Sequence, residues 1–254
     1  MPLRHDGCVT FWAEAKVHEC EFGEPSGAQV VVFGDSHAEQ WFPAIQQIAT
    51  RSHWHVTTML KASCPSIQVP IYNPTLRRVE DECWTWREEA VRRIIRMHAS
   101  LVVLSNSSGY VRRNGAPADG YSRLSYRDWE QGAENLLRTL NAAGIRTAII
   151  RDTPVPHFDM LTCLSRVIDH PSLFSQRLCT LNRGDALDDA VWRTEQGAAR
   201  QFGNVVTVDM TDRFCDGAHC APIVEGQVVY RDTNHIAYGF AALQSDILEK
   251  RLLN

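Results

Sequence analysis

Short, continuously apolar segments alternate along this chain with longer amphipathic ones. Five apolar segments have the length and composition of buried strands, at residues 28–34, 55–60, 101–105, 146–151 and 205–209. Because these segments lack an alternating polar face, both of their faces must be covered, which is typical of parallel strands between layers of helices. The amphipathic segments predict helices at 38–52, 83–98, 128–143, 184–202 and 236–252.

This alternation predicts an α/β fold, a three-layer, doubly wound (flavodoxin-like) and mostly parallel five-stranded sheet with helices on both faces. A length of 254 residues and a hydrophobic content of 44% are enough for one sizeable core. We expect residues 28–254 to form the main domain and residues 1–27 to form an N-terminal extension packed on it. The net charge of -4 gives no basic field, so we expect no nucleic-acid partner.

Eight cysteines fall in sequence-local twos, which are Cys8 and Cys20, Cys64 and Cys83, Cys163 and Cys179, and Cys215 and Cys220. An even count of this kind indicates four disulfides and an oxidising compartment, but it does not fix the pairing. Buried free thiols are one alternative, and a zinc site at Cys215, His219 and Cys220 is another. Residues 1–20 contain no apolar export signal, so either the thiols are reduced in a cytosol or the chain is a piece of a longer protein.

Two longer segments, residues 62–81 and 153–180, interrupt the alternation of strands and helices. Both contain proline and cysteine. We expect irregular loops there, held by disulfides rather than by a core of their own.

Polar residues follow two of the predicted strands, at the carboxyl ends where parallel sheets bind ligands. Ser36 lies in Gly34-Asp35-Ser36-His37-Ala38, at the start of a predicted helix, where its hydroxyl could act as a nucleophile. The alternative is that Asp35 or Ser36 only caps that helix. Asn106 directly follows residues 101–105, and its amide could donate to an oxyanion or simply form a turn.

Asp232 and His235 are three residues apart, just before the last predicted helix. At this spacing the carboxylate can hold one imidazole nitrogen and leave the other to face a serine. The alternative is a surface turn in which these side chains only cap the chain.

These motifs together resemble the SGNH (GDSL-like) hydrolase superfamily. More narrowly, the chain from about Cys8 to its end resembles the extracytoplasmic SGNH domain fused to the C-terminus of acyltransferase-3 (AT3) membrane proteins, the bacterial cell-surface glycan O-acyltransferases. The segments that carry the resemblance are VVVFGDSHAEQWFPAI, KASCPSI with Cys83, TPVPHFDMLTC, CDGAHC and VVYRDTNHIAYGFAAL.

The resemblance implies that Ser36 is the nucleophile, that His235 is the general base and then acid, and that Asp232 orients His235. It also implies an oxyanion hole formed by the Ser36 N–H and the Asn106 side chain. The superfamily's second donor is a glycine N–H after the second strand, where this chain has Lys61-Ala62-Ser63-Cys64. The N–H of Ser63 is our candidate for that donor. The resemblance implies no cofactor and no metal.

The function implied is transfer of an acyl group, such as acetyl, to hydroxyls of a bacterial cell-surface glycan. The acyl donor would come from an AT3 membrane domain, upstream in the same polypeptide or separate, and the setting would be the periplasm or the outer face of the membrane. The alternatives are a secreted esterase that deacylates glycan or lipid, and a catalytically degenerate glycan-binding module. The resemblance also implies disulfides 8–20, 64–83, 163–179 and 215–220, and an export signal in the upstream domain.

Three further groups of residues have less specific interpretations. His37, adjacent to Ser36, is expected to be structural or a rim contact. The tryptophans at 41, 84 and 86 are expected to pack in the core, with stacking on sugar rings as the alternative. Arg112 and Arg113 are expected in a solvated loop, with contact to an anionic acyl group or glycan as the alternative.

Overall fold

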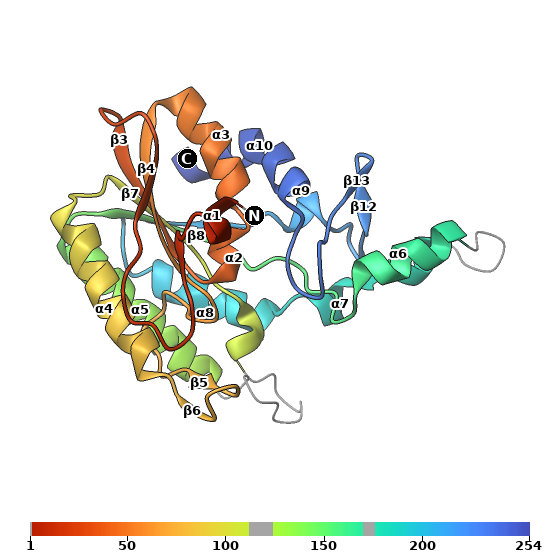
Figure 1. The fold of residues 1–254 in the computed structure, drawn as a ribbon, viewed down its shortest axis with the longest axis horizontal. Helices are drawn as coiled ribbons and strands as arrows, with labels where there is room; N and C mark the ends of the chain where they lie inside the picture. The colour runs from red at the N-terminus through yellow and green to blue at the C-terminus, as the bar shows by residue number, and fades with distance from the viewer. Residues whose placement is uncertain (1, 112–123, 170–175) are drawn as a thin grey trace.

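A computed structural model describes residues 2–111, 124–169 and 176–254. Through these residues runs a seven-stranded sheet in the order β1-β4-β3-β7-β8-β10, with β2 also paired to β4 (Figure 1). Its strands are β1 Val9–Thr10, β2 Cys20–Gly23, β3 Ala28–Gly34, β4 Trp54–Lys61, β7 Leu101–Ser105, β8 Arg146–Ile150 and β10 Val205–Val208. Three two-stranded sheets accompany it: β5 Tyr72–Asn73 with β6 Arg78–Val79, β9 Leu181–Asn182 with β11 His219–Cys220, and β12 Ile223–Val224 with β13 Gln227–Val228.

The five predicted strands are β3, β4, β7, β8 and β10, and every pairing among them is parallel. Their order across the sheet is second, first, third, fourth and fifth in the chain, which is the flavodoxin-like order. The predicted fold class is therefore confirmed. The sheet is wider than predicted, because residues before 28 add β1, parallel to β4, and β2, antiparallel to β4.

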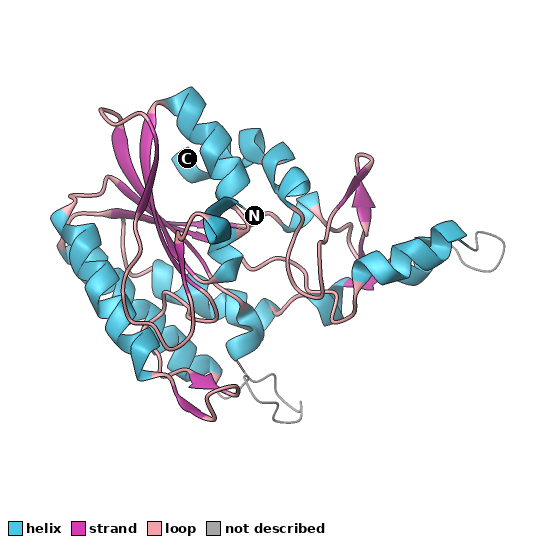
Figure 2. Cartoon of the chain, in the orientation of Figure 1, coloured by secondary structure: helices cyan, strands magenta, loops and turns pink. Residues whose placement is uncertain are grey.

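The helices lie on both faces of the sheet (Figure 2). They are α1 Pro2–His5, α2 Ser36–Glu39, α3 Phe42–Ser52, α4 Asp81–Arg96, α5 Tyr126–Ala142, α6 Met160–Asp169, α7 Arg183–Ala186, α8 Asp189–Ala199, α9 Tyr238–Leu243 and α10 Ser245–Leu253. Three predicted helices are each broken into two. The first break lies between α2 and α3, where Pro43 in the first turn of α3 lacks the N–H that a continuous helix would use.

Two hydrophobic cores sandwich the sheet, and β3 contributes to both. Val30 and Val32 lie in the core with α3, α9 and α10, whereas Val31 and Phe33 lie in the core with α4, α5 and α8. Consecutive side chains of a strand point to opposite faces, so a strand buried on both sides must be apolar throughout. This explains why the sequence of β3 does not alternate, and it fixes the strand end that carries Ser36.

All eight cysteines are paired, as Cys8–Cys20, Cys64–Cys83, Cys163–Cys179 and Cys215–Cys220. The predicted pairing is therefore confirmed. Free thiols are not found, and the zinc alternative at Cys215 and Cys220 is wrong because a disulfide occupies both sulfurs.

The segment 153–180 is not irregular throughout, and that expectation was wrong for α6. Met160, Leu164 and Val167 are its buried residues. Their spacing of four and then three residues places them on one helical face. In Figure 1, α6 projects away from the sheet. Among the described residues, no helix combines the length and the apolarity needed to span a lipid bilayer.

Candidate active site

Ser36 lies directly beyond β3, at the first position of α2. Strand β3 ends at Gly34, whose φ is +155°, and a Cβ there would lie 2.6 Å from the carbonyl oxygen of Ser105 on β7. Only glycine permits this close approach. Asp35 then caps α2, because its Oδ1 accepts a hydrogen bond of 2.8 Å from the N–H of His37. The capping role therefore belongs to Asp35, and the partly exposed Ser36 hydroxyl is left for other contacts.

The structure brings Ser36, His235 and Asp232 together in one hydrogen-bonded chain. His235 Nε2 lies 2.8 Å from Ser36 Oγ, and His235 Nδ1 lies 2.8 Å from Asp232 Oδ2. Asp232 Oδ1 also accepts hydrogen bonds from the N–H groups of Asn234 and His235, at 2.9 and 2.8 Å. The same carboxylate thus shapes the loop and orients the imidazole.

Gln40 links the loop that carries His235 to the segment that follows Ser36. Its Oε1 accepts a hydrogen bond of 2.9 Å from the N–H of Ile236, and its Nε2 donates to Thr153 Oγ1 at 3.2 Å. The side chain of Gln40 is fully buried. A residue four positions after Ser36 therefore holds the residue that follows His235.

The charges at this site favour a neutral imidazole beside an ionised carboxylate. Burial raises the pKa of Asp232, but the hydrogen bonds from the His235 ring and the Asn234 N–H outweigh it and hold that pKa well below its usual range. Burial also lowers the pKa of His235, which the hydrogen bond to Asp232 opposes. His235 is therefore neutral near pH about 7 and can accept a proton.

Asn106 follows β7, whose last residue Ser105 pairs with Gly34. Its Oδ1 accepts two hydrogen bonds from Ser66, from the N–H at 2.7 Å and from Oγ at 2.9 Å. These contacts fix the orientation of the amide, and they leave Nδ2 buried without a hydrogen-bond partner among the described residues. A buried, oriented and unused N–H donor is what an oxyanion requires.

Ser63 lies in the loop after β4, the neighbour of β3 in the sheet, and its φ is +58°. No hydrogen bond involves its backbone N–H within the described part of the chain. The N–H is therefore unengaged, as a second oxyanion donor would have to be.

Sequence reasoning missed Asp152 and interpreted His37 loosely. His37 Nδ1 lies 2.5 Å from Asp152 Oδ1, and the side chain of His37 is 1% exposed, so it is no rim contact. Asp152 Oδ2 also accepts a hydrogen bond of 2.6 Å from the N–H of Ser108, in the loop that carries Asn106. A signal was present, because Asp152 closely follows a predicted strand just as Ser36 and Asn106 do. Ser66 and Gln40 gave no comparable signal.

The remaining interpretations from the sequence have different outcomes. Trp41 and Trp86 are 1% and 0% exposed and pack in the core, whereas Trp84 is 43% exposed and does not. Arg112 and Arg113 lie outside the described residues. Within the described ranges, no three or more His, Cys, Asp or Glu side chains are grouped to hold a metal ion.

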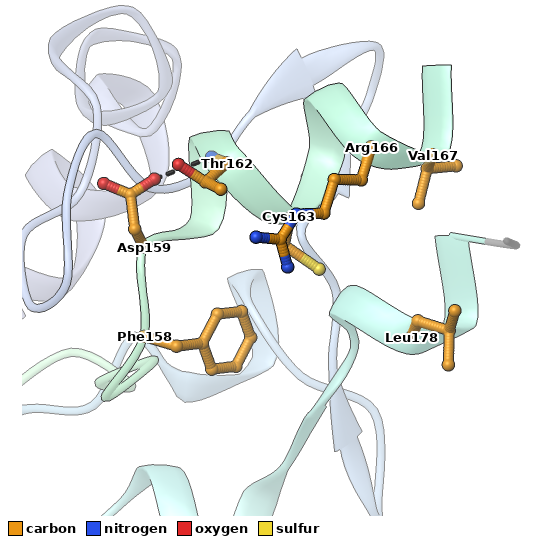
Figure 3. A pocket seen from close by; sticks show the side chains of 7 residues that line it. All are labelled: Phe158, Asp159, Thr162, Cys163, Arg166, Val167 and Leu178. Carbon is orange, nitrogen blue, oxygen red and sulfur yellow. Dashed lines mark hydrogen bonds between the residues drawn. The ribbon is translucent and has the colours of Figure 1, made fainter. Parts of the chain in front are cut away.

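A cavity of about 460 Å³ lies along α6, lined by Phe158, Asp159, Thr162, Cys163, Arg166, Val167 and Leu178 (Figure 3). It is connected to the catalytic candidates through the chain itself. The N–H of His157, the residue before Phe158, donates to the carbonyl oxygen of Thr233 at 3.2 Å. Phe158, which lines the cavity, therefore directly follows a residue that is hydrogen-bonded to the loop between Asp232 and His235.

This arrangement has the parts of an acyl-transfer site. A hydroxyl, a neutral imidazole and an ionised carboxylate are linked in series, with oriented N–H donors on the adjacent strand ends. Such a series activates an oxygen nucleophile toward a carbonyl carbon.

Comparisons with known proteins identify relatives in fold and a sequence family. In fold, the chain is similar to the lipopolysaccharide acetyltransferase periplasmic domain of Salmonella ser. Paratyphi A, with a TM-score of 0.69 and 12% identity over 91% of this chain and 85% of that one. It is also similar to a catalytic mutant of Axe2, an acetylxylan esterase from Geobacillus stearothermophilus, with a TM-score of 0.51 and 10% identity over 91% and 95% of the two chains. No curated protein sequence matches the chain. The family model described as the SGNH domain fused to AT3 domains matches residues 7–250, so the chain belongs to that family.

Proposed function

We propose that this domain moves an acyl group, through an ester on Ser36, to a hydroxyl group of a bacterial cell-surface glycan. The observation that carries the proposal is the series Asp232–His235–Ser36, with contacts of 2.8 Å on both sides of the imidazole. Membership of a family fused to AT3 domains supports acyl transfer over unrelated hydrolytic chemistry. The lipopolysaccharide acetyltransferase domain among its fold relatives suggests acetyl as the group and a glycan as the acceptor.

The first half of the reaction acylates Ser36. His235 Nε2 takes the hydroxyl proton while Oγ attacks the acyl carbonyl, and Asp232 stabilises the imidazolium that forms. The negative oxygen of the tetrahedral adduct accepts hydrogen bonds from the Ser36 N–H and from Asn106 Nδ2, with the Ser63 N–H as a third candidate donor. His235 then returns the proton to the leaving group as the bond to it breaks.

The second half transfers the acyl group from Ser36. His235 removes the proton from a sugar hydroxyl, whose oxygen attacks the ester carbonyl of Ser36. The same donors hold the negative oxygen, and the proton returns from His235 to Ser36 Oγ. The site regains its starting state.

We further propose that the acyl donor comes from an AT3 membrane domain, in the same polypeptide or separate, and that the domain works outside the cytoplasm. The family description supports the partner. The four disulfides support the compartment, because such bonds persist in oxidising surroundings.

Ester hydrolysis is the second candidate function. Ser36 and His235 are both partly exposed, so water can reach the acyl-enzyme as well as a sugar can. The two functions differ in the acceptor and share every residue of the triad.

The test supplies purified protein with p-nitrophenyl acetate, with and without an oligosaccharide acceptor. Ser36→Ala is expected to lower turnover by about 10³-fold or more, since the ester can no longer form. Ser26→Ala, on a distant turn, is the matched control and should behave as the wild type. Mass spectrometry should find an acetylated peptide containing Ser36 and an acetylated sugar.

Release of acetate at the same rate with any acceptor, and without an acetylated sugar, would favour the esterase. Turnover unaffected by Ser36→Ala would contradict both functions and support a glycan-binding module.

A further inference from the structure

We propose that His37, paired with Asp152, is a buried cation that acts on His235 and keeps it in the neutral, proton-accepting form. The proposal rests on the proposed function, and it makes His37 and Asp152 positioning residues rather than members of the triad. It assigns a role to two residues at the ends of β3 and β8.

The two histidines are neighbours in space although they are far apart in the chain. The ring centroids of His37 and His235 are 5.1 Å apart. His37 directly follows Ser36 in the chain, and the Ser36 hydroxyl hydrogen-bonds to His235 at 2.8 Å. A charge on His37 would thus be close to the atom that must accept the proton.

Asp152 gives His37 its charge. The two side chains are 1% and 9% exposed, and the hydrogen bond between them is 2.5 Å long. The carboxylate of Asp152 also accepts hydrogen bonds from the N–H groups of Ser108 and Thr153, at 2.6 and 2.8 Å, which favour its ionised form. Burial is the largest single influence and disfavours a charged His37, but Asp152, together with Asp35 and Asp232, outweighs it and raises the pKa of His37 to about 9.

Other charged groups also act on the two rings. Asp35 and Asp232 favour the charged form of His37. Asp232 favours protonation of His235, whereas His37 and Arg231 oppose it. Arg231 lies 3.5 Å from Asp232 and over the ring of Tyr238, and Arg4 and Asp159 lie close enough to act on the Asp232 carboxylate. His37 is the one cation in this group that is fully buried, so water screens it least.

The second nitrogen of His37 argues against a purely structural role. Nε2 is buried and has no hydrogen-bond partner in the described part of the structure. A histidine kept only for packing would be expected to satisfy both nitrogens or to be replaced by an apolar residue, since an unpaired buried polar group is destabilising. A cation beside the base offers a reason to retain it.

The consequence is a dependence of activity on pH. Activity needs neutral His235 and is lost as the pH falls through the pKa of that residue. Removing the cation lets His235 gain its proton at higher pH, so the acidic limb of kcat/KM moves upward. If the His37–Asp152 pair only holds the ends of the strands together through Ser108, then removing the pair lowers activity by the same factor at every pH.

The test compares His37→Asn, Asp152→Asn and the double variant. The asparagine amide can still donate to Asp152 near the place of Nδ1, but it carries no charge. Each single variant is expected to move the acidic limb of kcat/KM for p-nitrophenyl acetate upward by about one pH unit. The double variant should move it no further, since either change alone removes the cation. His53→Asn, at an exposed histidine with φ of +51°, is the matched control and should leave the limb in place.

A second measurement separates this proposal from the proposed function. NMR titration of the His235 ring reports its protonation whether or not the protein turns over an ester, and it should show the same upward shift in all three variants. An unshifted His235 titration would overturn the proposal. If the variants shift the His235 titration and the wild-type protein acylates nothing, the charge effect is supported and the proposed enzymatic function is rejected. If one single variant fails to fold, the other and the uncharged double variant give the same comparison.

Discussion

Residues 62–81 and 153–180 are both long connections that follow strands of the sheet, and each is held by one disulfide. The bonded cysteines are 19 residues apart in the first case and 16 in the second. Residues 62–69 of the first segment are mostly buried, whereas the second segment carries α6 outward from the sheet (Figure 1). Nearly equal covalent loops therefore support two different kinds of structure.

The first segment is anchored many times over. The guanidinium of Arg87 on α4, only 2% exposed, donates to the backbone carbonyls of Pro65, Ile67 and Val69. Lys61 and Glu80 form a fully buried ion pair of 2.9 Å between the two ends of the segment. Its disulfide is one fastening among several, and the segment can hold Ser66 against Asn106.

Among its described residues, the second segment has fewer anchors. Thr153 accepts a hydrogen bond from Gln40, the N–H groups of Val155 and His157 donate to the carbonyl oxygens of Ala186 and Thr233, and the disulfide Cys163–Cys179 links α6 to the returning chain. Several apolar side chains remain exposed there: Phe158, Leu161, Ile168 and Leu178. A disulfide can therefore be the main fastening of one segment and a supplement in another.

The largest effect is expected at Arg87. Arg87→Ala leaves three buried carbonyls without their donor, so the free energy of unfolding should fall by about 3 kcal/mol or more. Urea denaturation measures it. Arg166→Ala, on the exposed face of α6, is the matched control and should change it by less than about 0.5 kcal/mol. If Arg87→Ala and Arg166→Ala lowered the free energy of unfolding by similar amounts, residues 62–81 would not be more firmly anchored than residues 153–180.

Removing the disulfides should give a smaller and more instructive difference. Cys64→Ala with Cys83→Ala should lower the free energy of unfolding by about 3 kcal/mol, because the unfolded chain gains loop entropy while the native segment stays in place. For Cys163→Ala with Cys179→Ala we expect the free energy of unfolding to fall by less than about 1 kcal/mol. Without the disulfide, α6 also loosens in the folded protein, and this gain in native-state entropy offsets the gain in the unfolded chain. Hydrogen exchange should show faster exchange in α6 for the second pair. Equal losses of stability for the two cysteine pairs, with no faster hydrogen exchange in α6, would contradict the expected difference between the segments.

Within the first segment, the smallest effect on stability is expected at Ser66. Ser66→Ala removes the hydroxyl that contacts Asn106 Oδ1 but keeps the backbone N–H at 2.7 Å. We expect a stability loss of about 1 kcal/mol and a kcat lower by about ten-fold, as the amide becomes less well oriented. Ser165→Ala, whose hydroxyl bonds only within α6, should leave kcat unchanged. An unchanged kcat for Ser66→Ala would mean that the Ser66 hydroxyl, and with it the first segment, does not contribute to catalysis.

The features that could be predicted from sequence are those with local causes. Strands β3, β7 and β8 each contain a continuous run of apolar residues because both faces are covered there, and that pattern is visible in one window of sequence. The proximity of Ser36, His235 and Asp232 was predictable because Asp232 and His235 share one turn and because Ser36 lies in a motif with a family resemblance. Strands β1 and β2 were not predicted, since they are short and owe their conformation to pairing with β4.

The features that could not be predicted depend on contacts between distant residues. Asn106 and Ser66 are 40 residues apart, and His37 and Asp152 are 115 apart. Nothing in a local window distinguishes Ser66 from any other loop serine. Helix α6 was hidden for a different reason, because its buried face is only three residues wide and follows a proline-containing stretch.

The two short N-terminal strands also close one edge of β4. β2 pairs with residues 55–58 of β4 and β1 pairs with residues 60–61, so together they cover the side of β4 that faces away from β3. A chain trimmed to begin at Ala28 would expose that row of N–H and carbonyl groups on a long, largely apolar strand. Such an edge recruits other strands, including those of a second copy. Residues 9–23 therefore cover an edge that would otherwise be open to edge-to-edge pairing.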